Sequence, residues 1–268
     1  MNKKCTGAVL ACALALGAWS GSALATPVNV GGVIFDPDSP MDLSIQALNF
    51  RETAVSQVGD VLKGYGLIGS INGTDANTFC PACDLTFTFQ YTLQDVDTTG
   101  AQPRLVFDMG TLDFYVSAKG SFNVSDPTSV GSGPTWLSLA GHTASDSGYS
   151  TVGELYAVLN GTPGNPGNGS SGFGLLDVTG GMAGGYMDTN GRDDGADFTL
   201  NSSFQYFSDG ACADGTCYPI LGQGGLIGHS VNVPEPGVAG MLGLGLGLMG
   251  FLMWRRRKDD EVESESHA

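Results

Sequence analysis

The densest group of potential ligand side chains lies between residues 188 and 197. Asp188, Asn190, Asp193, Asp194 and Asp197 all carry side-chain oxygens and surround glycine-containing turns. Several carboxylates that converge on one cation are what Ca²⁺ requires. The spacing departs from the EF-hand pattern, because every alignment of its glycine puts an arginine or a wrong spacing at a ligand position. Calcium is therefore the only cofactor that the sequence indicates, and a solvated hairpin loop is the favoured alternative.

Four cysteines in the central part of the chain form two closely spaced pairs, Cys80 with Cys83 and Cys212 with Cys217. Three pairings are possible, and we favour the local one because its loops are shortest. Cys80 and Cys83 have the C-x-x-C spacing of redox sites. A strand-like run follows them directly, however, instead of the helix whose N-terminus lowers a thiol pKa. Zinc binding by the two distant pairs is a further alternative.

Histidine is scarce, and no local motif supports a catalytic triad although serine and aspartate are common. His142 and His229 are the only histidines before position 267, and no nucleophile elbow, H-E-x-x-H or glycine-rich phosphate loop occurs. A glycoside hydrolase needs two carboxyl groups about 5 to 9.5 Å apart. Glu52 and Glu154 are the only glutamates before position 235, and most aspartates lie in turn-like stretches. The sequence therefore predicts no catalytic residue, and a polysaccharide hydrolase is an alternative to a protein without enzymatic activity.

Sugar binding by stacking requires an exposed aromatic side chain. Trp136 is the only tryptophan between Trp19 and Trp254, so it is the candidate sugar-contact residue. Several tyrosines would add to such a surface, although packing in a core or across strands explains most of them. A surface-displayed carbohydrate-binding module is therefore a further functional alternative.

Strands are the elements that must position these residues. From Leu85 to Leu93, apolar side chains alternate with Thr and Gln, which places them on one face of a half-buried antiparallel strand. Comparable runs occupy residues 28–35, 58–71, 104–117, 135–140, 154–159 and 198–207. Turn dipeptides such as Asn72-Gly73 and Asn160-Gly161 separate them. The sequence therefore predicts an all-β fold, an antiparallel β-sandwich or jelly-roll-like body.

Three segments depart from this strand pattern. Residues 108–111 predict a turn inside the run 104–117, and Met41 to Phe50 predicts a short helix. The stretch from Thr162 to Gly172 is of low complexity, rich in Gly, Asn, Pro and Ser. Such a composition predicts a flexible surface loop that contributes nothing to a core.

The first 25 residues have the three parts of a secretory signal peptide. Lys3 and Lys4 precede an apolar stretch at 7–19, and Ala-Leu-Ala at 23–25 matches the cleavage pattern. We therefore expect export through Sec and removal of residues 1–25 by signal peptidase. The mature body would begin near Thr26 and extend over residues 26–232.

A second targeting segment occupies residues 233–258. Two prolines around a glutamate precede eighteen uncharged residues at 237–254, and four basic residues follow at 255–258. At about 1.5 Å per residue, an eighteen-residue helix is roughly 27 Å long, close to the ~30 Å hydrocarbon core of a bilayer. The basic cluster indicates the cytoplasmic side. Residues 259–268 would then form an acidic cytoplasmic tail, and the body would lie outside the cytoplasm.

The order of these three parts resembles the PEP-CTERM sorting signal of Gram-negative bacteria. The residues that carry the resemblance are Pro234, Glu235, Pro236, Arg255, Arg256, Arg257 and Lys258. The resemblance implies recognition by an exosortase, a membrane protease–transpeptidase that cuts near Pro-Glu-Pro and releases the body or attaches it within exopolysaccharide. The helix would be a transient inner-membrane anchor. Residues 259–268 depart from the family, whose members usually end soon after the arginine cluster, and an uncleaved membrane-anchored periplasmic protein is the alternative.

The charge of the body narrows the choice of partners. Residues 26–232 contain 21 acidic and five basic residues, a net charge of −16. Such a surface repels nucleic acid and anionic membranes, which excludes nucleic-acid binding. It attracts cations and basic partners instead.

Shorter stretches of the body resemble PEP-CTERM proteins that are associated with flocculation and the extracellular matrix. These stretches are residues 64–66, 70–74, 80–83 and 197–205. The resemblance implies a non-enzymatic role in holding cells within exopolysaccharide. We therefore expect a surface or extracellular-matrix protein that contributes to the cohesion of a biofilm or floc, with an exosortase and exopolysaccharide as partners.

Overall fold

A computed structural model describes residues 27–37, 43–146, 148–149 and 151–231, together with Leu246 and Met249. The predictions for the signal peptide, the Pro-Glu-Pro motif, the transmembrane helix, the basic cluster and the acidic tail lie outside the described residues. Among the described residues, no helix is long and apolar enough to cross a membrane. The predicted all-β class is confirmed, because the described chain consists mainly of antiparallel strands.

In the described part of the chain, ten strands form the main sheet. They are β3 (Leu43–Glu52), β4 (Val61–Ile71), β5 (Thr74–Asp75), β6 (Cys83–Asp97), β7 (Arg104–Ala118), β8 (Thr135–His142), β9 (Leu155–Val158), β12 (Ser170–Gly180), β13 (Phe198–Ala213) and β14 (Thr216–Gly228). Two small hairpins are β1 (Val28–Val30) with β2 (Val33–Phe35) and β10 (Gly161–Thr162) with β11 (Asn165–Pro166). The helical elements among the described residues are short: α2 (Ala76–Phe79), the 3₁₀ turn η1 (Pro127–Ser129) and α3 (Gly184–Met187).

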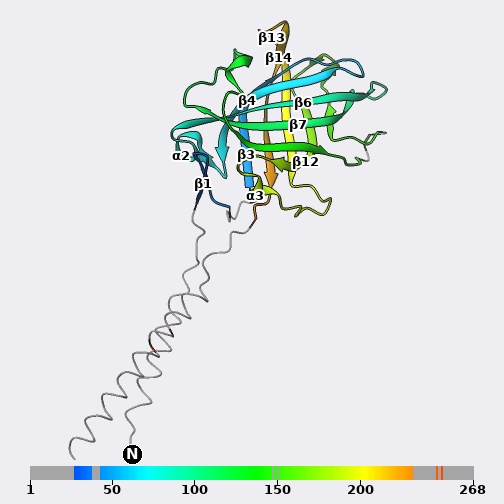
Figure 1. Cartoon of the computed structure of the whole chain (residues 1–268). Coiled ribbons are helices and arrows are strands. Elements are labelled where there is room, and N and C mark those ends of the chain that lie inside the picture. Colours follow the sequence, from blue (N-terminus) through cyan, green and yellow to red (C-terminus); the bar gives the residue numbers. More distant parts are fainter. Residues whose placement is uncertain are drawn as a thin grey trace, which may run out of the picture.

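The main sheet closes on itself. Pairing runs from β14 through β3, β4, β6, β7, β8 and β12 to β13, and β13 pairs again with β14. Where β8 ends, β9 takes its place between β7 and β12. In Figure 1, β6 and β7 cross the front of the molecule, whereas β3, β13 and β14 run steeply behind them. Two opposite walls of one sheet therefore supply the two packed layers that a sandwich requires.

The hydrophobic core lies between these walls. Buried side chains such as Phe87 and Phe114 pack together there, with ring centroids 5.8 Å apart. Gly66 on β4 pairs directly with Phe87 on the neighbouring strand β6, and the contact between them requires glycine at position 66. A Cβ atom on Gly66 would lie 2.6 Å from the Phe87 ring and 2.9 Å from the carbonyl oxygen of Asn49. Glycine therefore lets an aromatic ring on β6 cross the backbone of β4.

The β1–β2 hairpin packs against one end of the closed sheet. Trp136 on β8 donates a hydrogen bond from Nε1 to the carbonyl oxygen of Val30 at 3.1 Å. Phe35 contacts the rings of Trp136 and Tyr186 edge-on. The N–H of Val231 donates to the carbonyl oxygen of Tyr186 at 2.8 Å, so both ends of the described body meet at this base (Figure 1). The described residues between 27 and 231 thus surround one hydrophobic core, as expected of a unit that folds on its own.

The short helix predicted at Met41–Phe50 is wrong, because residues 43–52 form β3. This strand pairs with β14 on one side and with β4 on the other, and tertiary pairing overrides its local helical pattern. Irregular register at Ala47 lets Ile45, Ala47 and Phe50 all be buried despite the interrupted alternation.

Two other local predictions are also corrected. Residues 108–111 do not end a strand; they form a bulge inside β7, with Met109 at φ 51°. The low-complexity segment 162–172 is not wholly a flexible surface loop, because it contains β11 and the start of β12. Pro166 and Ser170 within it are buried. Composition correctly indicates turns here, but it does not show that the intervening residues pair with neighbouring strands.

Candidate functional site

The predicted calcium loop is organised around an inward-facing carboxylate. Asp197 is only 1% exposed. Its carboxylate accepts hydrogen bonds from the backbone N–H groups of Val178, Thr189 and Asn190 at 2.7 to 2.8 Å. These bonds connect the loop to β12, so the local structure gives Asp197 the role of an internal cap.

The other four predicted ligands do not converge on Asp197. Arg192 donates two hydrogen bonds to Asp194, from Nε at 3.0 Å and from Nη2 at 2.8 Å, and this pairing holds the pKa of Asp194 below its usual value. Asn190 donates from Nδ2 to Asp188, and Asp193 is exposed. Among the described residues, no group of three or more His, Cys, Asp or Glu side chains is placed to hold a metal ion. The geometry therefore favours the hairpin-loop interpretation over a calcium site.

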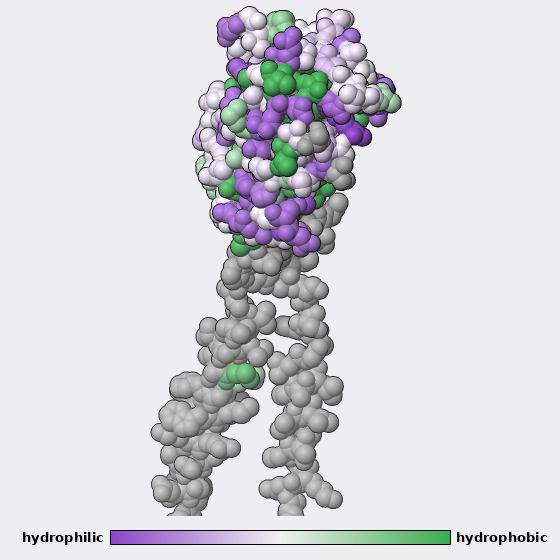
Figure 2. Space-filling model, turned by 90° about the vertical axis from the view of Figure 1, so that its right-hand side faces the viewer, coloured by the Kyte–Doolittle hydropathy of each residue, from purple (hydrophilic) through white to green (hydrophobic). Residues whose placement is uncertain are grey.

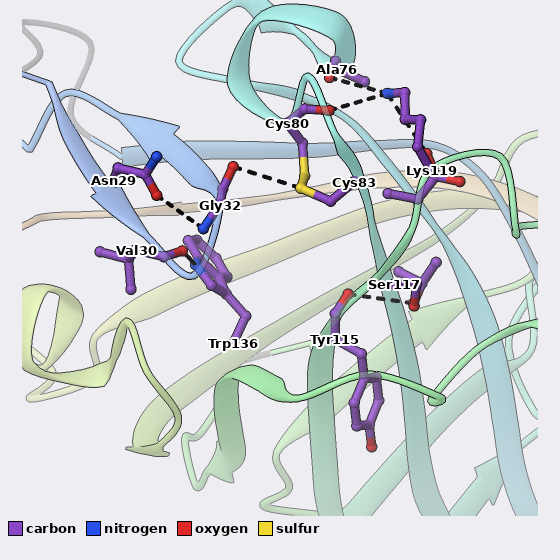
Figure 3. Close-up of a disulfide and its surroundings, with 12 residues drawn as sticks. Asn29, Val30, Gly32, Ala76, Cys80, Cys83, Tyr115, Ser117, Lys119 and Trp136 are labelled. Atoms are coloured by element: carbon purple, nitrogen blue, oxygen red, sulfur yellow. Dashed lines mark hydrogen bonds and ion pairs between the residues drawn. A yellow bond between two sulfur atoms is a disulfide. The ribbon is translucent and has the colours of Figure 1, made fainter.

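The predicted local disulfides are both present, Cys80–Cys83 and Cys212–Cys217. Figure 3 shows the first one between the end of α2 and the start of β6, beside Gly32 of the β1–β2 turn. Lys119 donates to the carbonyl oxygen of Cys80 at 3.2 Å. Cys80 follows the C-terminus of α2 and is fully buried, which is the reverse of the exposed helix N-terminus that activates a redox thiol. The first disulfide joins the end of α2 to β6 and the second joins paired residues of β13 and β14, so both fit a structural role.

The prediction that Trp136 contacts sugar at the surface is wrong. Its side chain is 0% exposed, and its ring packs against Phe35 and Phe114. The single polar atom of the indole already bonds to the backbone of the β1–β2 hairpin. A large aromatic residue with its N–H satisfied is a core residue that attaches the base to the sheet.

The residues considered for acid–base chemistry have structural partners. His142 at the end of β8 lies 2.9 Å from Asp177 on β12, measured from Nδ1 to Oδ2. Glu154 accepts a hydrogen bond from the N–H of Gly110 at 2.6 Å and thereby holds the bulge in β7. Neither contact places a nucleophile beside a base, so the described residues give no positive indication of a catalytic centre.

The sequence did not reveal an internal cavity of about 90 Å³ inside the closed sheet. Strands from both walls line it, namely β3, β4, β6, β7, β9, β12, β13 and β14. Most lining side chains are apolar. The polar exceptions are the carboxyl group of Glu52, the hydroxyl groups of Thr53 and Ser202, and the phenol of Tyr91. A few polar groups in a concave apolar site are typical of small-molecule binding.

Among the described residues that line the cavity, Glu52 carries the only ionisable carboxyl group. It is 6% exposed, and no group among the described residues donates a hydrogen bond to it. Burial therefore raises the pKa of Glu52 to about 8. The hydroxyl group of Tyr91 also has no partner among the described residues, whereas Thr53 both donates to Val61 and accepts from Lys63.

One signal in the sequence pointed to Glu52. In a strand, alternate residues share a face, so position 52 lies on the same side as Phe50. An acid at the end of an apolar face is a buried carboxyl candidate. The helical interpretation of Met41–Phe50 hid this relation, because residues two apart in a helix do not share a face.

The outer surface of the body is more polar than the lining of the cavity. In Figure 2, hydrophobic residues of the described body form separate small patches among hydrophilic and near-neutral residues. Scattered apolar residues of this kind are normal on a soluble domain. On the face shown, the surface therefore does not offer one broad apolar binding patch.

Comparison with known proteins identifies the segment that follows the body. The family model of the PEP-CTERM protein-sorting motif matches residues 232–258. The chain therefore carries the sorting motif predicted from its sequence, and this motif starts directly after Val231 at the base of the body. The motif implies processing by an exosortase and export toward the cell envelope or surface of a Gram-negative bacterium. No curated protein and no solved structure matches the chain.

The role of Asp197 is tested by substituting it with alanine in the body, residues 26–232. Because three buried or part-buried N–H groups lose their acceptor, Asp197→Ala is expected to lower the free energy of unfolding by about 3 kcal/mol. The exposed Asp193→Ala variant is the control and is expected to match the wild type within about 0.5 kcal/mol. Urea unfolding with and without calcium is the measurement. A calcium-dependent stabilisation of the wild type that both variants abolish would instead establish the predicted metal site.

Burial of Glu52 predicts a distinctive pH dependence. The pKa is about 8 in the folded state against an ordinary value of 4.5, so the folded protein binds more protons than the unfolded chain between these values. Stability should therefore fall as the pH rises from 5 to 8, by about 2 to 4 kcal/mol. Urea unfolding at several pH values between 5 and 8 measures this change in the free energy of unfolding.

The Glu52→Gln variant is the control for that measurement, because it cannot titrate and should lose most of the slope. Carboxyl groups with lowered pKa values change protonation below this window; they are Asp60, Asp97, Asp126 and Asp194. Equal slopes for Glu52→Gln and the wild type would show that Glu52 is ionised in the folded state.

Proposed function

We propose that this chain is a non-enzymatic protein of the extracellular matrix, which an exosortase sorts and whose body contacts exopolysaccharide. The observation that carries the proposal is the sorting motif at residues 232–258, placed directly after a self-contained folded body. A cut near Pro-Glu-Pro would separate the body from the membrane segment without removing any described strand. The two structural disulfides fit an oxidising location outside the cytoplasm.

An uncharged polar band on the outer face of the sheet supports polysaccharide contact. Adjacent strands bring Ser171, Ser203 and Gln223 into one cross-strand row. A neighbouring row joins Phe173 on β12 with Asn201 on β13. All five side chains belong to residues that are exposed at the surface. Amide and hydroxyl groups beside an aromatic ring suit neutral sugar hydroxyls, and this band replaces the buried Trp136 as the candidate contact surface.

A sedimentation assay tests this proposal with the body alone. We expect residues 26–232 to co-sediment with exopolysaccharide from the producing cells and to release no new reducing ends from it. Phe173→Ala should reduce the affinity by about two- to twelvefold, because a stacking ring contributes about 0.5–1.5 kcal/mol. Quantification of bound protein against polysaccharide concentration gives the affinity.

Phe207→Ala provides a matched control for this assay. Phe207 has nearly the same exposure as Phe173, 36% against 37%, and it lies on β13 beyond the residues that pair with β12. The Phe207→Ala variant should bind the polysaccharide with the affinity of the wild type. Absence of co-sedimentation would contradict the proposed contact, and new reducing ends would identify the polysaccharide-hydrolase alternative.

A further inference from the structure

We propose that the closed sheet binds one small, largely apolar molecule with a single hydroxyl or carbonyl group, and that Glu52 pairs with this group. The inference concerns the interior of the body, so it does not depend on the proposed contact between its outer face and polysaccharide. It assigns a ligand to the cavity between the walls and a recognition role to its one carboxyl group.

The size and composition of the cavity set the ligand class. A closed sheet of about eight strands has an interior that side chains fill or that holds one small ligand. Here about 90 Å³ remains empty. An apolar cavity of about 150 Å³ in another protein holds benzene. The present cavity is smaller, so a single ring or a short alkyl chain requires outward movement of the half-buried rings of Phe89 and Phe204 that line it.

The unpaired Glu52 explains why the ligand needs a polar group. A buried carboxyl group without a hydrogen-bond partner costs free energy, even when it is neutral. With its pKa raised to about 8 by burial, Glu52 is protonated near pH 6. A protonated carboxyl group donates one hydrogen bond and accepts others. A ligand hydroxyl or carbonyl group would supply the partner that the described residues lack.

The remainder of the lining restricts what else enters. Apolar side chains such as Leu62, Leu112 and Leu226 surround the cavity. They offer nothing to the many hydroxyl groups of a sugar or to an ion, whose desolvation would go uncompensated. The hydroxyl group of Tyr91 on β6 has no partner among the described residues, but it is enclosed by neighbouring atoms and does not reach the free space of the cavity. The site therefore selects a molecule with a single polar group.

The low-complexity segment contributes to the cover of this cavity. Gly164 and Pro166 of the β10–β11 hairpin belong to the lining. A Cβ atom on Gly164 would lie 3.5 Å from the Cβ atom of Ser56, so the hairpin meets the segment between β3 and β4. Val55 from that segment also lines the cavity. Two turn-containing segments, rather than a sheet wall, thus cover this side of the site.

Benzene and phenol form a probe pair that differs by one hydroxyl group. We expect both to shift the NMR signals of cavity-lining methyl groups in residues 26–232 at pH 6, in a saturable manner, with phenol bound more tightly. Glu52→Leu should weaken phenol binding about tenfold while benzene binding stays equal or improves, because only phenol uses the carboxyl group. Glu52→Gln should keep phenol affinity within about threefold of the wild type.

A cavity-filling variant keeps the proposal testable if Glu52→Leu does not fold. Ala157 on β9 lines the cavity and is 4% exposed. Ala157→Leu should abolish the binding of both probes while the circular dichroism spectrum stays unchanged. Absence of saturable shifts in the wild type would overturn the proposal. An unchanged ratio of phenol to benzene affinity in folded Glu52→Leu would overturn the role of the carboxyl group.

Discussion

Pairing between β12 and β13 is the interaction on which the rest of the structure depends. Seven consecutive residue pairs, from Ser170–Phe204 to Leu176–Phe198, join these strands and close the sheet. Closure removes the long unpaired edges at which β-proteins aggregate. It also divides every strand into an inward and an outward face. Residues one apart therefore point to opposite faces, as Arg51 and Glu52 show. Both are buried, but Glu52 lines the cavity, whereas Arg51 lies on the other face near Tyr65 and Asp209.

This division separates two kinds of recognition in one small body. The outer face of β12, β13 and β14 presents uncharged polar groups, and the inner face of the same strands contributes to an apolar cavity. The two ends of the described body meet at the base, beyond the last paired residues of the sheet. Removal of a sorting segment at 232–258 therefore leaves the sheet intact. The fold thus allows the body to be detached as a unit.

Local patterns in the sequence predicted much of this structure, but not its long-range pairing. Alternation identified most strands, short loops identified both disulfides, and the three-part tail identified the sorting motif. Alternation shows which residues share a face and not which strands become neighbours, so closure was not foreseen. Two predictions failed because the sequence does not show which way a side chain points. Asp197 was predicted to bind calcium, but it turns inward and accepts hydrogen bonds from backbone N–H groups. Trp136 was predicted to contact sugar at the surface, but it lies in the core.

The mass of the protein recovered outside the cells tests most directly whether the body is exported and released by sorting. Intact mass spectrometry with sequencing of the terminal peptides would define both ends of the chain. The account predicts a chain that begins near Thr26 and ends near Pro234–Pro236, with any excess mass reporting attached glycan. A chain that retains its tail through Ala268 and occurs only in membranes would contradict it and identify a permanently anchored periplasmic protein.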